Sequence, residues 1–229
     1  AKLISNRRTP IAKKIYEELG GSSPILKLTK DQSIVLEKRL NQNEKNEEYK
    51  CFIVMRCWHP RAKEVIENVK LYNPDEIILM PLYPQYSAAT SGSSIKEWND
   101  VCKKNNYKIK TSTICCYPID ENFINAHTKE INKKIKDLKN FKLIFSAHGL
   151  PEKNIKKGDP YQWQVEQSVN KIIENLNYHN LDWILSYQSR VGPLKWIGPS
   201  TDNTIIENSK IGKHIVLVPI AFVSEHSET

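Results

Sequence analysis

"KLIFSAHGLP", residues 142–151, joins a short apolar run to an abrupt turn. The letters LIFS are apolar enough for a buried strand, and the Gly149 and Pro151 that follow favour neither a continued helix nor a continued strand. His148 stands inside this turn. A histidine that only filled space would not need its backbone turned in this way. We therefore interpret His148 as a side chain that a rigid strand end directs into a cleft.

Apolar runs of strand length recur along the chain and alternate with segments of helical periodicity. They predict strands at 51–56, 76–83, 108–116, 141–146, 181–189 and 214–222. The segments between them predict helices near 61–71, 93–105, 120–138, 161–176 and 201–209. Strands that are apolar throughout and are followed by helices favour parallel sheets covered on both faces, so the predicted fold class is α/β.

Polar, aromatic, Gly- and Pro-containing segments follow most of the predicted strands. In chain order they are CWHP, PQYSAATSGSS, AHGLP, RVGPLKWIGP and VSEHSE. Open α/β sheets bind ligands in a crevice outside the carboxyl ends of their strands. We therefore expect the functional groups of the molecule to gather at these strand ends.

The segment SEHSE (224–228) places two carboxylates and an imidazole just after a predicted buried strand. Glu225, His226 and Glu228 can form a metal site, an acid–base pair or an exposed turn. Together with His148 from another strand end, Glu228 suits either delivery of a metal ion or removal of a proton. Aromatic side chains crowd the same strand ends, and arginines occur near the beginning of the chain, which fits a flat apolar ligand that carries carboxylates.

The amino-acid composition excludes some classes of protein and some classes of binding partner. The chain has 34 Lys and Arg against 26 Asp and Glu, a formal net charge of +8 that favours anionic partners. Its lysines are scattered and form no nucleic-acid motif, so we expect no nucleic-acid partner. The mean hydropathy is −0.54, and no apolar run approaches the roughly 20 residues of a membrane-spanning helix. Five cysteines without a CxxC pair fit a reducing cytosol.

Several segments resemble, in the same order, those of the ferrochelatase family. They are RRTP, GGSSP, MRCWHP, PLYPQYSAATSGSS, SAHGLP, GDPY, YQSRVGPLKWIGPSTD and VPIAFVSEHSET, and the resemblance extends over essentially all 229 residues. It implies two Rossmann-like, chelatase-type domains, each a parallel sheet flanked by helices, with the active cleft between them. The expected domains are residues 1–139, without the first strand of the family, and residues 140–229, without its C-terminal part. We therefore expect a fragment.

The resemblance also implies roles for individual residues. His148 and Glu228 match the catalytic pair of the family, which removes pyrrole protons or ligates the incoming metal. Glu225 and His226 match the residues that support this pair. The positions at which the family binds its substrate correspond to Arg8, Tyr16, Ser23, Arg56, Tyr86 and Trp196.

The activity implied by the resemblance is that of a lyase that inserts ferrous iron into protoporphyrin IX, the last step of haem biosynthesis. Iron is then a substrate, zinc and cobalt are expected surrogates, and no prosthetic group is required. Two alternatives remain open: a related tetrapyrrole chelatase for another metal, and a truncated porphyrin-binding remnant without turnover. We expect a cytoplasmic protein whose basic charge supports peripheral association with the inner face of an anionic membrane.

Overall fold

The computed structural model describes residues 9–10, 13–14, 16–18, 20–43, 47–190 and 192–224. The chain separates into two compact units. Unit 1 contains Ala1–Asp75, Glu97–Lys108 and Ser224–Thr229, and unit 2 contains Glu76–Lys96 and Ile109–Val223. The predicted domain boundary between residues 139 and 140 stays a prediction.

Unit 1 contains the helices α2 (Ile25–Asn43) and α3 (Ala62–Tyr72). Helix α3 confirms the helix predicted near 61–71, whereas no helix was predicted over α2. The buried residues of α3 recur every three or four positions and form one apolar face: Ala62, Val65, Ile66 and Val69. Its first turn is closed by Glu64, whose carboxylate accepts a hydrogen bond from the Arg61 backbone N–H at 2.8 Å.

The strand predicted at 51–56 is wrong. Residues 51–55 pair with no strand among the residues that the structure describes. Their backbone groups find other partners, because the Cys51 N–H donates to the Glu37 carboxylate at 2.7 Å and the Met55 N–H donates to the Pro60 carbonyl at 2.7 Å. An apolar run indicates burial, but a strand also needs a neighbouring strand to which it can bond.

The first sheet of unit 2 is a parallel pair, β1 (Glu76–Leu79) and β2 (Lys110–Thr113). Helix α4 (Ser91–Lys104) lies between them in the sequence, as a parallel connection requires. Both strands are shorter than the predicted runs at 76–83 and 108–116. Strand β1 ends before Pro81, which has no backbone N–H to donate to a neighbouring strand.

The second sheet of unit 2 has three parallel strands in the order β4-β3-β5. Its central strand is β3 (Phe141–His148), which lies between β4 (Trp183–Gln188) and β5 (His214–Pro219). The middle of β3, residues 143–147, is buried throughout, which accounts for its continuous apolar run. The two parallel sheets and their helices confirm the predicted α/β fold class.

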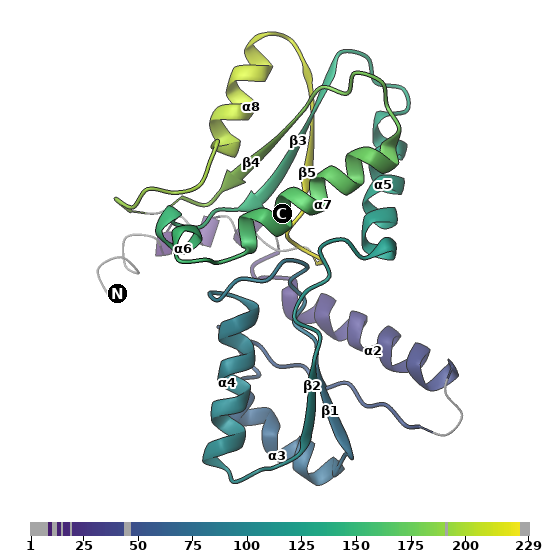
Figure 1. Cartoon of the computed structure of the whole chain (residues 1–229), viewed down its shortest axis with the longest axis vertical. Coiled ribbons are helices and arrows are strands. Elements are labelled where there is room, and N and C mark those ends of the chain that lie inside the picture. The colour runs from purple at the N-terminus through teal and green to yellow at the C-terminus, as the bar shows by residue number, and fades with distance from the viewer. Residues whose placement is uncertain are drawn as a thin grey trace. The chain divides into compact units, whose positions relative to one another are not determined.

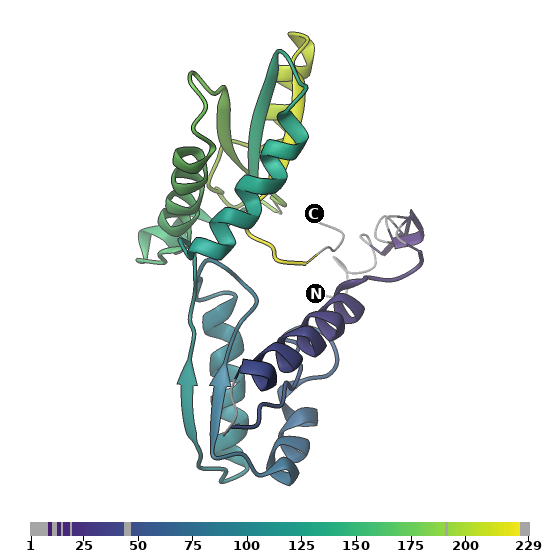
Figure 2. The ribbon, with the colours of Figure 1, turned by 90° about the vertical axis from the view of Figure 1, so that its right-hand side faces the viewer.

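Helices cover both faces of the second sheet (Figures 1 and 2). Helices α5 (Glu121–Ile135) and α7 (Tyr161–Leu176) pack with Leu143, Phe145 and Ala147 in one hydrophobic core. Side chains alternate along a strand, so Ser146 points to the opposite face. There it meets α8 (Thr201–Lys210), where the Ser146 and Thr201 hydroxyls lie 3.2 Å apart. The short α6 (Glu152–Lys156) follows β3 and was not predicted.

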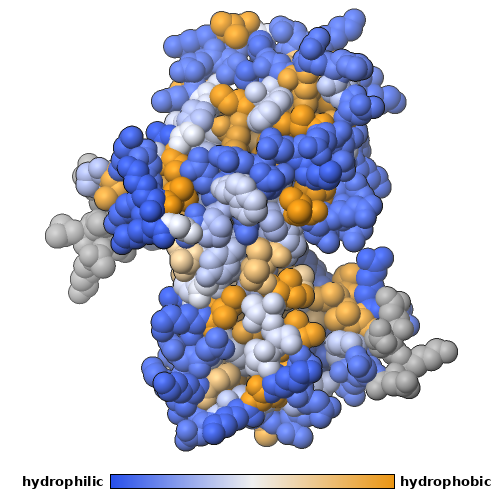
Figure 3. All heavy atoms as spheres, in the orientation of Figure 1, coloured by the Kyte–Doolittle hydropathy of each residue, from blue (hydrophilic) through white to orange (hydrophobic). Residues whose placement is uncertain are grey.

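The face of the molecule shown in Figure 3 is mainly hydrophilic. Figure 3 shows hydrophilic side chains over most of the face in view, with smaller hydrophobic areas between them. Individual apolar side chains also reach solvent, with Leu71 83% and Trp58 67% exposed, which is ordinary for protein surfaces. Among the described helices, none is both long and apolar enough to cross a membrane.

Candidate active site

His148 ends β3, as the sequence predicted for a side chain held at a strand end. Its Nδ1 lies 2.8 Å from the carbonyl oxygen of Gly149. A carbonyl oxygen only accepts hydrogen bonds, so Nδ1 carries the proton in the neutral ring. Nε2 is then the basic nitrogen of His148, the atom that can accept a proton or bind a metal ion.

The backbone around His148 is fixed from two sides. The buried Tyr161 hydroxyl donates to the His148 carbonyl at 2.9 Å, and the Gly149 N–H donates to the Gln188 carbonyl at 2.8 Å. A Cβ atom on Gly149 would lie 2.9 Å from that carbonyl oxygen and 3.2 Å from the Trp196 ring. Only glycine fits between these groups, which explains the Gly that follows the histidine.

Trp196 reaches this strand end on the loop that follows β4. The Ile197 N–H donates to the Leu150 carbonyl at 3.0 Å, and residues 151 and 196 form an antiparallel bridge. The Arg190 guanidinium closes the loop by donating to the Ile197 carbonyl at 3.1 Å. The structure therefore brings Trp196, a predicted substrate-binding residue, next to the turn that holds His148.

Tyr86 lies on the loop that follows β1, and α7 holds the backbone of this loop. The Tyr86 N–H donates to the Gln164 side-chain oxygen at 2.6 Å. The Asp159 carboxylate accepts hydrogen bonds from the Ser87 hydroxyl at 2.8 Å and the Ala88 N–H at 3.0 Å. A Cβ atom on Gly92 would lie 2.6 Å from the Tyr86 hydroxyl oxygen, so this glycine leaves room for the tyrosine.

Three further predicted residues lie in unit 1. Arg56 pairs with Glu97 at 3.2 Å, and Arg61 binds the other oxygen of the same carboxylate. The Ser23 hydroxyl accepts a hydrogen bond from the Ile25 N–H at 3.4 Å, next to the start of α2. Tyr16 lies on a helical turn, and its carbonyl accepts from the Gly21 N–H at 2.6 Å. The remaining predicted residues, Arg8, Glu225, His226 and Glu228, lie outside the described residues.

Residue-level reasoning assigned no functional role to Tyr161 and Gln164, and it interpreted Asp159 only as part of the cap of the helix that follows. Asp159 and Tyr161 belong to GDPY, which also contributed to the family resemblance. One signal in the sequence could have identified Gln164. It is a polar residue on the apolar face of a helix that also carries Val165 and Val169, and a polar group buried there needs a hydrogen-bond partner.

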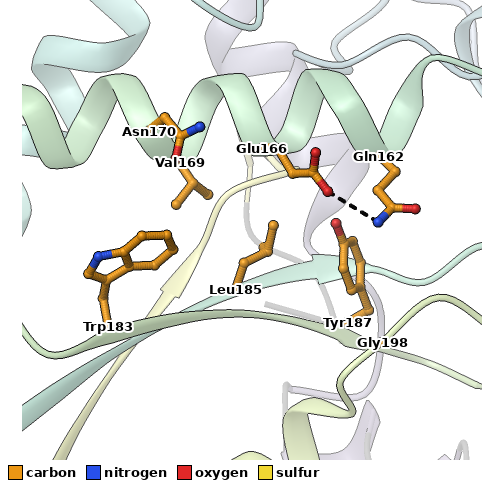
Figure 4. A pocket seen from close by; sticks show the side chains of 8 residues that line it. All are labelled: Gln162, Glu166, Val169, Asn170, Trp183, Leu185, Tyr187 and Gly198. Carbon is orange, nitrogen blue, oxygen red and sulfur yellow. Dashed lines mark hydrogen bonds between the residues drawn. The ribbon is translucent and has the colours of Figure 1, made fainter.

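A cavity of about 300 Å³ lies between helix α7 and strand β4, on the face of the second sheet that α7 covers (Figure 4). Tyr187 pairs with Ala147 in the sheet, so its side chain and that of His148 point to opposite faces. In Figure 4 the Tyr187 hydroxyl points towards the hydrogen bond between the Gln162 amide and the Glu166 carboxylate, which is 3.1 Å long. The other lining residues are Val169, Asn170, Trp183, Leu185 and Gly198. This cavity was not predicted and is separate from the turn that holds His148.

Comparison with known proteins covers the whole chain. The family described as ferrochelatase matches residues 1–229. The chain is 83% identical to the ferrochelatase of Pelagibacter ubique (strain HTCC1062), covering 100% of this chain and 67% of that protein. It is 51% identical to the ferrochelatase of Wolbachia sp. subsp. Drosophila simulans (strain wRi), with coverages of 100% and 73%. It is 48% identical to the ferrochelatase of Rickettsia bellii (strain OSU 85-389), with coverages of 100% and 63%.

Proposed function

Because this chain belongs to the ferrochelatase family, whose members insert ferrous iron into protoporphyrin IX, we propose that His148 and Glu228 are its catalytic pair. The observation that carries the proposal is the hydrogen bond from His148 Nδ1 to the Gly149 carbonyl, because it makes Nε2 the basic nitrogen. The position of His148 at the carboxyl end of a buried parallel strand also supports it, since such ends form ligand crevices.

The reaction exchanges two pyrrole protons for one ferrous ion. In the proposed mechanism His148 Nε2 accepts the two pyrrole protons one after the other and releases each before it takes the next, as a neutral imidazole can near neutral pH. The Glu228 carboxylate relays a proton or holds the ferrous ion before transfer, because oxygen and imidazole ligands both suit divalent iron. The flat macrocycle resists metal entry, and a site that holds it distorted spends on the order of 1–5 kcal/mol of binding energy on that strain.

The remaining predicted residues bind the substrate or support Glu228 in this proposal. Arg56, Tyr86 and Trp196 lie near the macrocycle or the metal route. Arg8, Tyr16 and Ser23 contact the propionates or line the pocket, and Glu225 and His226 support Glu228. The support for Trp196 is its packing against Gly149, directly after His148.

We also propose that the reaction needs no prosthetic group and that the partners are protoporphyrin IX and ferrous iron, without nucleic acid. We further propose that the protein is cytoplasmic and attaches loosely to an anionic membrane. The net charge of +8 supports this attachment. Flotation of the protein with vesicles tests the attachment: binding to anionic vesicles that is absent with zwitterionic vesicles supports it, and equal behaviour with both contradicts it.

Zinc insertion into protoporphyrin IX, followed by fluorescence, tests the proposed function without oxidation of ferrous iron. We expect His148→Ala and Glu228→Gln each to lower turnover on the order of 100-fold or more, as for loss of a general base. His179→Ala is the matched control, because His179 is exposed on the turn after α7 and is expected to keep full turnover.

Three results would overturn parts of the proposal. Parental turnover in His148→Ala would remove His148 from the chemistry. A chain that binds protoporphyrin without any metal insertion would instead be the porphyrin-binding remnant considered above, and a preference for a more polar tetrapyrrole would indicate the related chelatase.

A further inference from the structure

The beginning of α7 contacts two proposed parts of the site at once. Tyr161 is the first residue of the helix, and Gln164 follows one turn later. Residues three positions apart lie on the same face of a helix, about 5 Å apart along its axis. The Tyr161 side chain is hydrogen-bonded to the strand end that carries His148, and the Gln164 side chain is hydrogen-bonded to the loop that carries Tyr86.

The Tyr161 hydroxyl donates a hydrogen bond to the His148 carbonyl. Its side chain is 6% exposed, and its hydroxyl lies 2.9 Å from that carbonyl oxygen. Burial, together with the nearby Tyr187, raises the pKa of Tyr161 far above its ordinary value, so the hydroxyl stays protonated and remains a donor. The backbone N–H of Tyr161 is itself held by the Asp159 carboxylate at 3.1 Å.

The side-chain oxygen of Gln164 accepts a hydrogen bond from the Tyr86 backbone N–H. It is 9% exposed, and its oxygen lies 2.6 Å from the Tyr86 nitrogen. The other end of its amide group is held as well, because the nitrogen donates to the Cys116 thiol at 3.5 Å. The amide therefore has little freedom to turn, and its position fixes that of the Tyr86 backbone.

The same loop is also tied to α7 at its neighbouring residues. Asp159 accepts from Ser87 and Ala88, and the buried Gln85 side chain donates to the Ser168 hydroxyl at 2.9 Å. Helix α7 and Asp159, which lies just before it, thus hold the loop at four successive residues, 85–88. A shift of the helix start would move the loop and the His148 carbonyl together.

We propose that Tyr161 and Gln164 are positioning residues for metal insertion, Tyr161 through His148 and Gln164 through Tyr86. The proposal rests on the roles proposed above for His148 and Tyr86. One helix that is hydrogen-bonded both to the strand end of the base and to the loop of a substrate-binding residue keeps their separation constant. A misplacement of about 1 Å in a catalytic site costs on the order of 100-fold in rate.

Steady-state zinc insertion separates the two roles. Tyr161→Phe removes only the hydroxyl, and we expect kcat to fall about tenfold while KM for protoporphyrin stays within about twofold, because His148 is misplaced but the ring still binds. Gln164→Ala is expected to raise KM, and the dissociation constant for metal-free protoporphyrin, about tenfold with kcat nearly unchanged. Gln164→Glu keeps the accepting oxygen and is expected to restore both values.

Gln162→Ala is the matched control, because Gln162 lies on the same helix and bonds only to Glu166 among the contacts described. It should leave kcat and KM unchanged. If kcat and KM of the Tyr161 and Gln164 variants do not change, or if the fall in kcat of Tyr161→Phe equals the loss of folded protein seen in a thermal melt, the positioning roles are wrong. Failure of the proposed function looks different, because His148→Ala then keeps its turnover or the parental chain has none.

Discussion

At the scale of single residues, the Tyr187 hydroxyl has an unusual environment. The side chain is 1% exposed, and the hydroxyl has no hydrogen-bond partner within the described part of the chain. Burial and the nearby Glu166 carboxylate raise the pKa of Tyr187, so the hydroxyl remains protonated. A buried polar group without a partner costs about 1–3 kcal/mol relative to a satisfied one.

Tyr187→Phe therefore tests whether this hydroxyl destabilises the fold. We expect the free energy of unfolding to rise by about 1 kcal/mol, because the ring keeps its packing while the desolvated oxygen is removed. Urea titration monitored by circular dichroism measures the change. Tyr178→Phe is the control, since Tyr178 is 46% exposed and its replacement should change little. A loss of about 1 kcal/mol in Tyr187→Phe would show instead that the hydroxyl is bonded.

At the scale of elements, the sequence predicted what depends on local pattern. Strand β3 and helices α3, α5 and α7 follow from apolar runs and periodicity, and His148 from the Gly and Pro beside it. The strand at 51–56 was wrong because a strand depends on a neighbour that the run itself does not contain. Helix α2 was missed although apolar residues recur within it, since the exposed Ile34, Val35 and Leu36 blur its periodicity.

The amino ends of the three strands in the second sheet meet at one carboxylate. Asp182, just before β4, pairs with Lys142 of β3 at 2.6 Å and with Lys213, just before β5. Burial raises the pKa of Asp182, but the hydrogen bonds from the two lysines outweigh this effect and hold the pKa below its usual value of 3.8. The carboxylate therefore stabilises the fold above that pH, and the contribution is lost as the pH falls through the lower pKa of the folded state.

Asp182→Asn is expected to lower the free energy of unfolding at pH 7 by about 1 kcal/mol, because two lysines lose a partly exposed partner. The difference from the parent should shrink as the pH falls below 3.8, where the parental carboxylate also becomes protonated. Chemical unfolding at pH 7, 5 and 3 measures this trend. Asp137→Asn, at an exposed aspartate between α5 and β3, should behave like the parent at all three. A constant deficit for Asp182→Asn at every pH would contradict the assigned charge effect.

At the scale of the whole molecule, long-range contacts decide what sequence reasoning could not. Gln164 and Tyr86 are 78 positions apart, and Asp159 and Ser87 are 72 apart, so their pairing follows from the packing of α7 and not from any local pattern. The chemistry-bearing types were visible in the sequence, whereas the groups that hold them in place became visible only in the fold. The net charge, by contrast, is a property of the whole molecule that can be counted directly from the sequence.

The net charge of +8 predicts how substrate binding responds to salt, because protoporphyrin IX carries two propionates. Raising the salt concentration from about 0.1 M to 1 M shortens the screening length from roughly 10 Å to 3 Å. We expect KM for protoporphyrin in zinc insertion to rise about tenfold over this range with kcat nearly constant, since screening weakens attraction before the chemical step. A porphyrin whose propionates are esterified should show no such rise in the same detergent. An equal rise for the ester would show that attraction between the propionates and the protein is not its cause, and no rise for either substrate would mean that the positive charges lie too far from the site to act.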